Sequence, residues 1–239
     1  MEAAPDKLIT VTNPQSPVAE AYRTLRTNIL FSSLDSPLKT LLVTGAGPEV
    51  ENSVVLCNLA VSIAQGGAKV IVVDGDLRRP MIHRFFQLGN DKGLTTALIG
   101  DSGEALPLQP TLVPDLQLLT SGPLPPNPSD LLSTQKMERV IQSLSSAADL
   151  VLFGAPPIGY LADAALLAAK VDGSILVISA GKTRRDVALR AKIALEKAST
   201  RLLGVVLDNA QLDRDLIKVM DGSGGSRSAR SWLPFRRNK

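Results

Sequence analysis

Residues 39–67 have the sequence KTLLVTGAGPEVENSVVLCNLAVSIAQGG. The apolar run at 39–44 predicts a buried strand, and residues 53–65 predict a helix that ends at Gly66-Gly67. The glycine-containing segment between them joins the end of the strand to the start of the helix. In many α/β folds this is the position of a loop that holds phosphate groups. The stretch therefore predicts one strand–loop–helix unit of a parallel sheet.

Similar apolar runs recur along the rest of the chain, and helical patterns separate most of them. They predict further strands at 70–74, 116–120, 150–153, 174–179 and 202–207. Helices are expected over 18–31, with Ser16 as N-cap and Pro17 at the first helical position, and over 183–198. Apolar strands that alternate with helices are typical of a parallel sheet covered on both sides. We therefore expect a single α/β domain with a doubly wound, mostly parallel sheet flanked by helices, and a ligand site at the carboxyl ends of the strands.

Composition divides the 239 residues into one domain and two terminal segments. Residues 1–16 hold two prolines and no periodicity and are expected to form an extended lead-in, and residues 17–221 form the domain. The Gly- and Ser-rich residues 222–239 are expected to be a flexible basic tail. This tail holds five basic residues and no acidic one, whereas the whole chain has a net charge of +3, so the domain itself is slightly acidic. The charge distribution argues against nucleic acid as a partner.

The chain has few thiol and imidazole groups, which argues against disulfide-rich proteins and against several kinds of metal site. A single cysteine, Cys57, excludes a disulfide framework, and a single histidine, His83, argues against a zinc site built from several imidazoles. Cys57 is expected in the core and His83 in a surface or packing role. The N-terminus lacks the pattern of a signal peptide, and no apolar run approaches the ~18 residues of a membrane span. We therefore expect the protein in the cytoplasm.

The loop after the first predicted strand departs from the usual phosphate-binding form, which is G-x-x-x-x-G-K-[ST]. Gly47 provides the first glycine, but Glu51 stands at the second glycine and Asn52 at the lysine. Ser53 keeps its residue type. The frame of a phosphate loop is therefore present without the cation that meets the phosphates.

Acidic residues follow the predicted strand at 70–74. Asp74 and Asp76, at alternate positions after a buried strand, can serve a Mg²⁺ ion or act as a base. The alternative is that they cap the following turn. The strand at 150–153 continues into Gly154, where a carboxylate would complete a magnesium site but glycine has no side chain to do so.

Several motifs in a fixed order carry a resemblance to a known family. They are EAYRTLRTN at 20–28, AGP at 46–48, VDGDLRRP at 73–80, TSGPLPPNPSDLL at 120–132, APP at 155–157 and AGKTRRD at 180–186. In these motifs the chain resembles the tyrosine kinases of bacterial capsule and exopolysaccharide synthesis (BY-kinases), relatives of the septum-site and plasmid-partition ATPases. The resemblance covers roughly residues 15–210. It implies a P-loop NTPase-like fold with a deviant phosphate loop, binding of ATP with Mg²⁺, and phosphorylation of tyrosine.

Departures from the family's motifs concentrate in the nucleotide site, whose loop positions here are Gly47, Pro48, Glu49, Val50, Glu51, Asn52, Ser53 and Val54. Glu49 and Glu51 stand where the family has glycines, which let backbone N–H groups approach phosphate oxygens. Asn52 removes the lysine. Gly154 stands at the aspartate of the third acidic motif, and Asp208 stands near the position where relatives usually have an asparagine that contacts the base.

The tyrosines also depart from the family, which carries a C-terminal tyrosine cluster as its autophosphorylation target. The tail here has no tyrosine, and the chain's two tyrosines, Tyr22 and Tyr160, lie inside the predicted domain. We therefore expect a catalytically impaired homologue that acts as a regulatory or scaffolding subunit in polysaccharide synthesis or export. The alternative is an active ATP-dependent tyrosine kinase that uses Asp74 and Asp76, with Ser53 and Asp74 at the metal. A partition-type scaffold with other cargo is a third possibility.

The resemblance also implies partners. The helix that carries Glu20, Arg23 and Arg26 makes subunit contacts in the family, which implies a homo-oligomer; the alternative is a solvated, salt-bridged face. A membrane-bound activator of the polysaccharide co-polymerase type, or an active paralogous kinase, is the expected protein partner. The tail places Trp232, Leu233 and Phe235 beside basic residues, a combination that can contact an anionic membrane surface. The alternatives are a peptide that docks on a protein partner and an inert, disordered tail.

Overall fold

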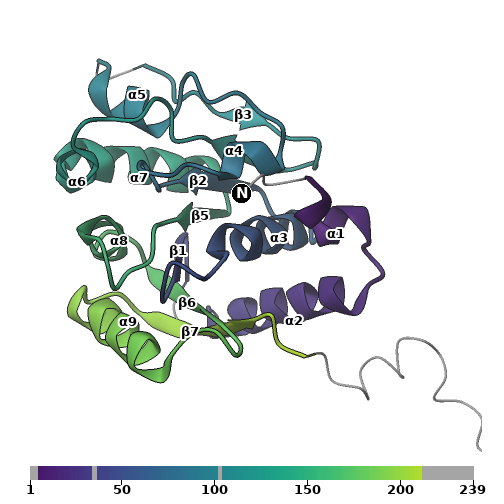
Figure 1. The fold of residues 1–239 in the computed structure, drawn as a ribbon. Helices are drawn as coiled ribbons and strands as arrows, with labels where there is room; N and C mark the ends of the chain where they lie inside the picture. The colour runs from purple at the N-terminus through teal and green to yellow at the C-terminus, as the bar shows by residue number, and fades with distance from the viewer. Residues whose placement is uncertain (1–4, 34–36, 102–103, 212–239) are drawn as a thin grey trace, which may run out of the picture.

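The computed structural model describes residues 5–33, 37–101 and 104–211. In this part of the chain seven strands form one sheet, in the order β3-β4-β2-β5-β1-β6-β7 (Figure 1). They are β1 (Thr40–Gly45), β2 (Val70–Asp74), β3 (Gln109–Pro110), β4 (Leu116–Leu119), β5 (Leu150–Gly154), β6 (Gly173–Ser179) and β7 (Leu202–Asp208). Only β3 runs antiparallel to its neighbour. The predicted α/β fold with a mostly parallel sheet is confirmed.

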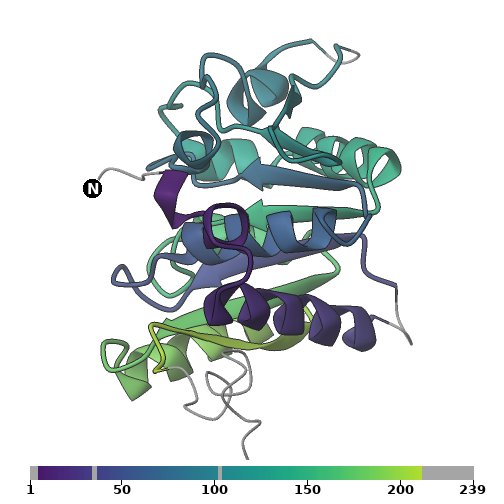
Figure 2. The same ribbon diagram turned by 90° about the vertical axis from the view of Figure 1, so that its right-hand side faces the viewer.

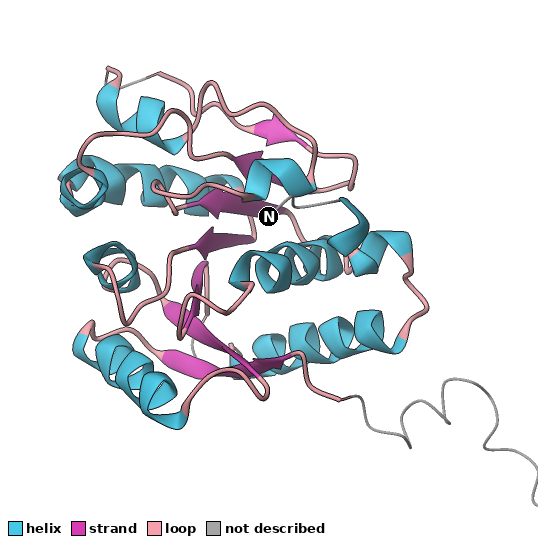
Figure 3. Ribbon diagram, in the orientation of Figure 1, coloured by secondary structure: helices cyan, strands magenta, loops and turns pink. Residues whose placement is uncertain are grey.

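Helices cover both faces of this sheet (Figure 3). One face carries α1 (Ile9–Thr12), α2 (Pro17–Ser32), α3 (Asn52–Ala64) and α4 (Ile82–Phe85), and the other carries α5 (Leu94–Ile99), α6 (Pro128–Ser133), α7 (Gln135–Ala147), α8 (Ala162–Ala168) and α9 (Arg185–Lys197). Alternate residues of β1 point to opposite faces: Leu41 and Val43 join the apolar cluster under α3, and Leu42 joins the cluster on the other side. Because both faces are covered, β1, β2 and β5 are buried throughout.

Local sequence signals explain where α2 begins. Ser16 accepts a hydrogen bond from the backbone N–H of Ala19 at 3.1 Å, and Pro17 occupies the first helical position. Both expectations for this helix start are confirmed. The predicted ends of the other strands and helices agree with the observed ends to within one or two residues. The sequence does not predict the strand β3, because two residues are too few to give a periodic signal.

The expectation of an extended lead-in over 1–16 is wrong for the part that the structure describes, residues 5–16. A short 3₁₀ helix, η1 (Pro5–Lys7), and α1 pack beside α3 (Figure 2). Leu8 and Thr10 are buried, and the backbone N–H and Oγ1 of Thr10 both donate to Oδ1 of Asn58, at 3.0 and 2.9 Å. The buried Asn58 amide needs these partners, so the core of the domain holds the segment in helical turns. The tail, 222–239, lies outside the described residues.

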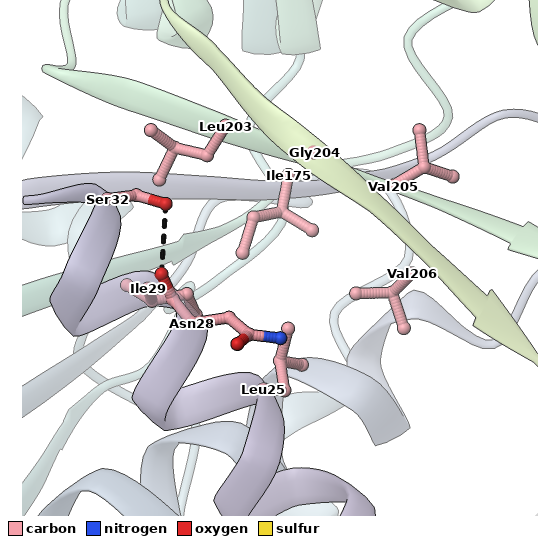
Figure 4. Close-up of a pocket in the computed structure, with 9 residues that line it drawn as sticks. All are labelled: Leu25, Asn28, Ile29, Ser32, Ile175, Leu203, Gly204, Val205 and Val206. Atoms are coloured by element: carbon pink, nitrogen blue, oxygen red, sulfur yellow. Dashed lines mark hydrogen bonds between the residues drawn. The ribbon is translucent and has the colours of Figure 1, made fainter.

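The strand order places the loops of interest side by side. β5 lies between β1 and β2, so the loops that follow these three strands leave the same edge of the sheet. A separate groove of about 180 Å³ lies between α2 and the edge strand β7, against side chains such as Leu25, Ile29 and Val206 (Figure 4). Among the residues that the structure describes, no titratable side chain lines this groove. In the described ranges, no helix has both the length and the apolar character of a membrane span.

Candidate functional site

The motifs that follow β1, β2 and β5 meet at the carboxyl edge of the sheet. Gly154 at the end of β5 pairs with Val43 of β1 on one side and with Asp74 of β2 on the other. Beyond the strands, the N–H of Ile158 donates to the carbonyl oxygen of Gly45 at 3.1 Å, so the loop after β5 packs against the loop after β1. The structure therefore brings together the three positions that sequence reasoning assigned to one site.

Glu49 is partly exposed, and its carboxylate lies against the phosphate-loop frame. Thr183 Oγ1, from the loop after β6, donates to Glu49 Oε1 at 2.8 Å. The other carboxylate oxygen, Oε2, lies next to Gly47, so close that it would collide with a side chain at that position. The backbone N–H of Val50 donates to the carbonyl oxygen of Gly47 at 3.2 Å and closes the turn. A carboxylate therefore lies beside the first glycine of the loop.

Glu51 and Asn52 are also held by partners inside the chain. Glu51 forms an ion pair with Lys7 at 2.6 Å, which joins the loop to η1. Asn52, the first residue of α3, is 9% exposed, and its Nδ2 donates to the carbonyl oxygen of Ala155 at 2.8 Å. Pro48 is exposed, Val50 is buried, and Ser53 and Val54 are partly exposed at the start of α3.

Asp74 is buried at the end of β2, and its carboxylate caps the next segment. Its Oδ2 accepts from the backbone N–H groups of Met81 and Ile82 at 3.1 and 3.0 Å, and its Oδ1 accepts from that of Asp76 at 3.3 Å. Burial raises the pKa of Asp74 to about 7, the hydrogen bond from Ile82 opposes this rise, and the charge of Asp76 adds to it. The turn-capping alternative therefore describes the observed contacts of Asp74.

Asp76 and Gly154 complete the acidic part of the site. Asp76 Oδ1 accepts from the backbone N–H groups of Arg78 and Arg79 at 3.1 and 2.9 Å, so it too caps a turn. A Cβ added at Gly154 would lie 2.7 Å from Leu56 Cδ2 and 2.9 Å from Ile82 Cδ1, so apolar groups fill the space of a side chain there. Over the described part of the chain, no three or more His, Cys, Asp or Glu side chains gather closely enough to hold a metal ion.

An ion pair that sequence reasoning missed links the loops after β2, β4 and β5. Arg78 donates to the fully buried Asp163 of α8 through Nε at 2.7 Å and through Nη2 at 3.2 Å, and Ser129 Oγ donates to the same carboxylate at 2.7 Å. Burial alone would raise the pKa of Asp163, but the hydrogen bonds from Arg78 and Ser129 hold this pKa below its ordinary value. Arg78 and Ser129 belong to motifs of the resemblance, whereas nothing in the sequence marks Asp163 as their partner.

Asp208 lies away from the phosphate loop, at the end of the edge strand β7. Its Oδ2 accepts from Asn209 Nδ2 at 3.0 Å. Its charge also adds to the effect of burial in raising the pKa of Tyr22 on α2. The predicted base-contact position is therefore separated from β1 by β6 and lies near Tyr22.

The three charged residues of the expected assembly helix make contacts within the chain. Arg23 pairs with Glu20 and also donates to the carbonyl oxygen of Pro14. Arg26 Nη1 donates to the carbonyl oxygen of Ser62 on α3 at 2.6 Å. These contacts fix α2 against its neighbours, and the predicted role in self-assembly stays a prediction.

Comparison with known proteins shows which sequences this chain resembles. Tyrosine-protein kinase YwqD of Bacillus subtilis is 42% identical over 207 residues, which cover 87% of this chain and 87% of that protein. A putative tyrosine-protein kinase of Staphylococcus aureus, CapB, is 35% identical over 202 residues, which cover 84% of this chain and 89% of CapB. No protein-family model matches the chain.

Solved structures show the same relationship. The chimerical protein CapA2B2 superposes with a TM-score of 0.82 at 33% identity, over 87% of this chain and 91% of the chimera. The cell division ATPase MinD of Pyrococcus furiosus shares the fold with a TM-score of 0.62 at 22% identity, over 77% of this chain and 79% of MinD. The resemblance to these kinases and the P-loop NTPase-like fold are thus confirmed, and the chain belongs to the family of bacterial tyrosine-protein kinases.

Proposed function

We propose that this chain is a catalytically impaired member of its family, which acts as a regulatory or scaffolding subunit in capsular or exopolysaccharide synthesis. The proposal rests on the nucleotide site. A site for ATP with Mg²⁺ needs a loop of backbone N–H groups, a lysine and carboxylate ligands. The residues present here do not fit that group, because glutamates stand at two glycine positions of the loop, Asn52 stands at the lysine, and Gly154 removes one of the carboxylates.

The observation that carries the proposal is the position of Glu49. Its carboxylate accepts a hydrogen bond from the hydroxyl of Thr183 and lies beside Gly47, which favours a position close to the loop over one in solvent. A unit charge pair about 4 Å apart interacts by roughly 4 kcal/mol at an effective dielectric near 20. A phosphate group at that distance from this carboxylate would therefore lose up to roughly three powers of ten in affinity, at about 1.4 kcal/mol per tenfold.

The other replacements act in the same direction. Asn52 supplies no charge, and its amide already serves the carbonyl oxygen of Ala155. Gly154 offers no ligand, and the side chains of Leu56 and Ile82 close over the space where one would begin. A metal would be left with Ser53 and with Asp74, whose carboxylate accepts three backbone N–H groups.

The test is whether the full chain binds Mg-ATP or Mg-ADP. Binding is measured by calorimetry and by the shift in melting temperature when nucleotide is added. Wild type is expected to show no shift. The variant Asn52→Lys with Glu49→Gly and Glu51→Gly should gain a shift, and Asn52→Lys alone should gain much less, because the two carboxylates remain. Bacillus subtilis YwqD measured in parallel is the positive control. A wild-type shift as large as that of YwqD would contradict the proposal.

A second candidate function is an active ATP-dependent tyrosine kinase. It is favoured by the relatives' names and by Asp74, whose pKa near 7 suits a general base. Incubation of the purified chain with Mg-ATP separates the two functions. Phosphotyrosine formed in the absence of any other kinase would support the active enzyme, and its absence supports the impaired one.

The partners are proposed on the same grounds. The superposition on the CapA2B2 chimera supports a membrane-bound activator as a partner, and an active paralogous kinase is the alternative. Self-association through α2 remains part of the proposal. The basic tail, 222–239, lies outside the described residues; we expect it to hold the protein weakly at an anionic inner membrane surface, with an attraction that salt screens over about 8 Å.

A further inference from the structure

Tyrosine side chains are scarce in this chain, and their environments differ sharply. The sequence holds two, Tyr22 and Tyr160. Tyr22 packs against the apolar cluster between α2 and α3, and burial raises its pKa well above the ordinary value. Tyr160 lies in the turn between β5 and α8, and 57% of its surface is exposed. One hydroxyl is therefore withdrawn into the fold and the other is presented to solvent.

The turn that carries Tyr160 is fixed at its base and open at its tip. Ile158 is 4% exposed, and its N–H donates to the carbonyl oxygen of Gly45. The N–H of Tyr160 closes the turn by donating to the carbonyl oxygen of Pro157 at 3.2 Å. Gly159, beside Tyr160, is exposed as well. The phenol is therefore displayed on a loop packed directly against the phosphate-loop frame, next to a residue that adapts easily to another protein's groove.

We propose that Tyr160 is a phosphorylation site, modified in trans by an active tyrosine kinase of the same family with ATP as the phosphoryl donor. This proposal rests on the proposed function, in which the chain is a partner of such a kinase and not itself the enzyme. In the reaction Tyr160 Oη forms a bond to the γ-phosphorus, the bond from that phosphorus to the β–γ bridging oxygen breaks, ADP leaves, and the phenolic proton passes to solvent. The product carries about −1.5 to −2 charges at neutral pH.

A phosphate on Tyr160 would lie near the phosphate-loop frame and would affect the binding of anionic ligands there. The loop after β5 packs on residues 45–46, and the carboxylate of Glu49 already lies beside Gly47. A dianion on Tyr160 adds like charge to this edge of the sheet and opposes the approach of any anionic ligand. Phosphorylation is therefore expected to lower the affinity for Mg-nucleotide that the Asn52→Lys variant gains when both glutamates are changed to glycine.

The experiment incubates the full chain with ATP, Mg²⁺ and active Bacillus subtilis YwqD, and locates phosphotyrosine by intact-mass and tandem mass spectrometry. Wild type and Tyr22→Phe should each gain one phosphoryl group on Tyr160, and Tyr160→Phe should stay at background. Site location in wild type does not depend on the folding of any variant. Modification of Tyr22 in folded protein, or an unmodified Tyr160 under conditions in which YwqD phosphorylates itself, would overturn the proposal.

A parallel incubation without YwqD separates this inference from the proposed function. Phosphotyrosine in that sample would contradict catalytic impairment, and its location would still decide the role of Tyr160. If phosphotyrosine forms only with YwqD and on Tyr160, both proposals are supported. If it forms on neither tyrosine in either sample, the impaired enzyme is supported and the modification site is rejected.

Discussion

Asn52 at the start of α3 donates from Nδ2 to the carbonyl oxygen of Ala155 at 2.8 Å, which ties the phosphate-loop frame to the loop after β5. The bond is buried and lies one residue beyond Gly154. The two replaced positions are therefore neighbours in space. At the positions where the family resemblance implies a lysine and an aspartate, the structure has an amide hydrogen bond and apolar packing. This arrangement favours a site whose remaining contacts stabilise the fold.

Restoring the aspartate should strain this packing. Gly154→Asp introduces a Cβ that would lie 2.7 Å from Leu56 Cδ2, and it also places a carboxylate among buried groups. We expect a loss of about 1–3 kcal/mol in the free energy of unfolding, measured by urea denaturation. The matched control is Gly204→Asp on the edge strand β7, where an added Cβ meets nothing within 4 Å. Equal stability of Gly154→Asp and wild type would show that the core has kept room for the ligand.

How far the sequence predicts this molecule depends on the range of the interactions involved. The strands and α2 are predictable because apolar periodicity and the Ser16 cap are local signals. The turns of α1 are not, because they depend on Asn58, which lies far along the chain and offers a buried acceptor to Thr10. The ion pair of Asp163 is not predictable from local sequence either, because only the order of the strands brings Arg78 close to it.

The candidate site shows the same limit. Residue types at 49–53 and 154 are enough to predict a phosphate loop that departs from its usual form. The contacts of the two glutamates are not predictable in the same way, because Thr183 comes from the loop after β6 and Lys7 from η1. Whether a replaced residue is free or held depends on side chains that only the tertiary fold brings near.

Asp74 should make stability depend on pH. Its pKa in the folded protein, about 7, is above the ordinary value of an unfolded aspartate, so the folded state binds more protons between about pH 4 and 7. The contribution of Asp74 is therefore fully present below about pH 4 and is lost as pH rises through about 7. In Asp74→Asn, the fall in the free energy of unfolding with rising pH should be smaller than in wild type, by at most ~1.4 kcal/mol for each pH unit.

Urea denaturation of wild type and Asp74→Asn at several pH values between 5 and 8 measures this difference. The control is Asp101→Asn, which changes an exposed carboxylate. The difference in stability between wild type and Asp74→Asn should shift in favour of the variant as pH rises. A difference that stays constant over this range would contradict a raised pKa for Asp74.

Self-association through α2 can be tested without disturbing the fold. Arg23 bonds to Glu20 and to Pro14 near the surface, whereas Arg26 is bound to the backbone of α3. Arg23→Glu should therefore lower the apparent mass in light scattering and leave the melting temperature nearly unchanged. Arg26→Glu should lower the melting temperature as well, because it breaks a contact inside the chain. A monomeric wild type at high concentration would remove the assembly role.

The ion pair between Arg78 and Asp163 gives the sharpest stability prediction. The Asp163 carboxylate is fully buried, while the Arg78 side chain is 40% exposed, so the cost of removing one partner differs between the two ends. Arg78→Ala leaves a buried carboxylate with Ser129 as its remaining side-chain donor, which we expect to cost about 1–3 kcal/mol. Asp163→Asn should cost less, because the guanidinium left behind turns to water. The double variant should therefore be more stable than Arg78→Ala alone, as measured by urea denaturation. If the two single losses simply add, the burial of an unpaired charge is not what makes Arg78 necessary.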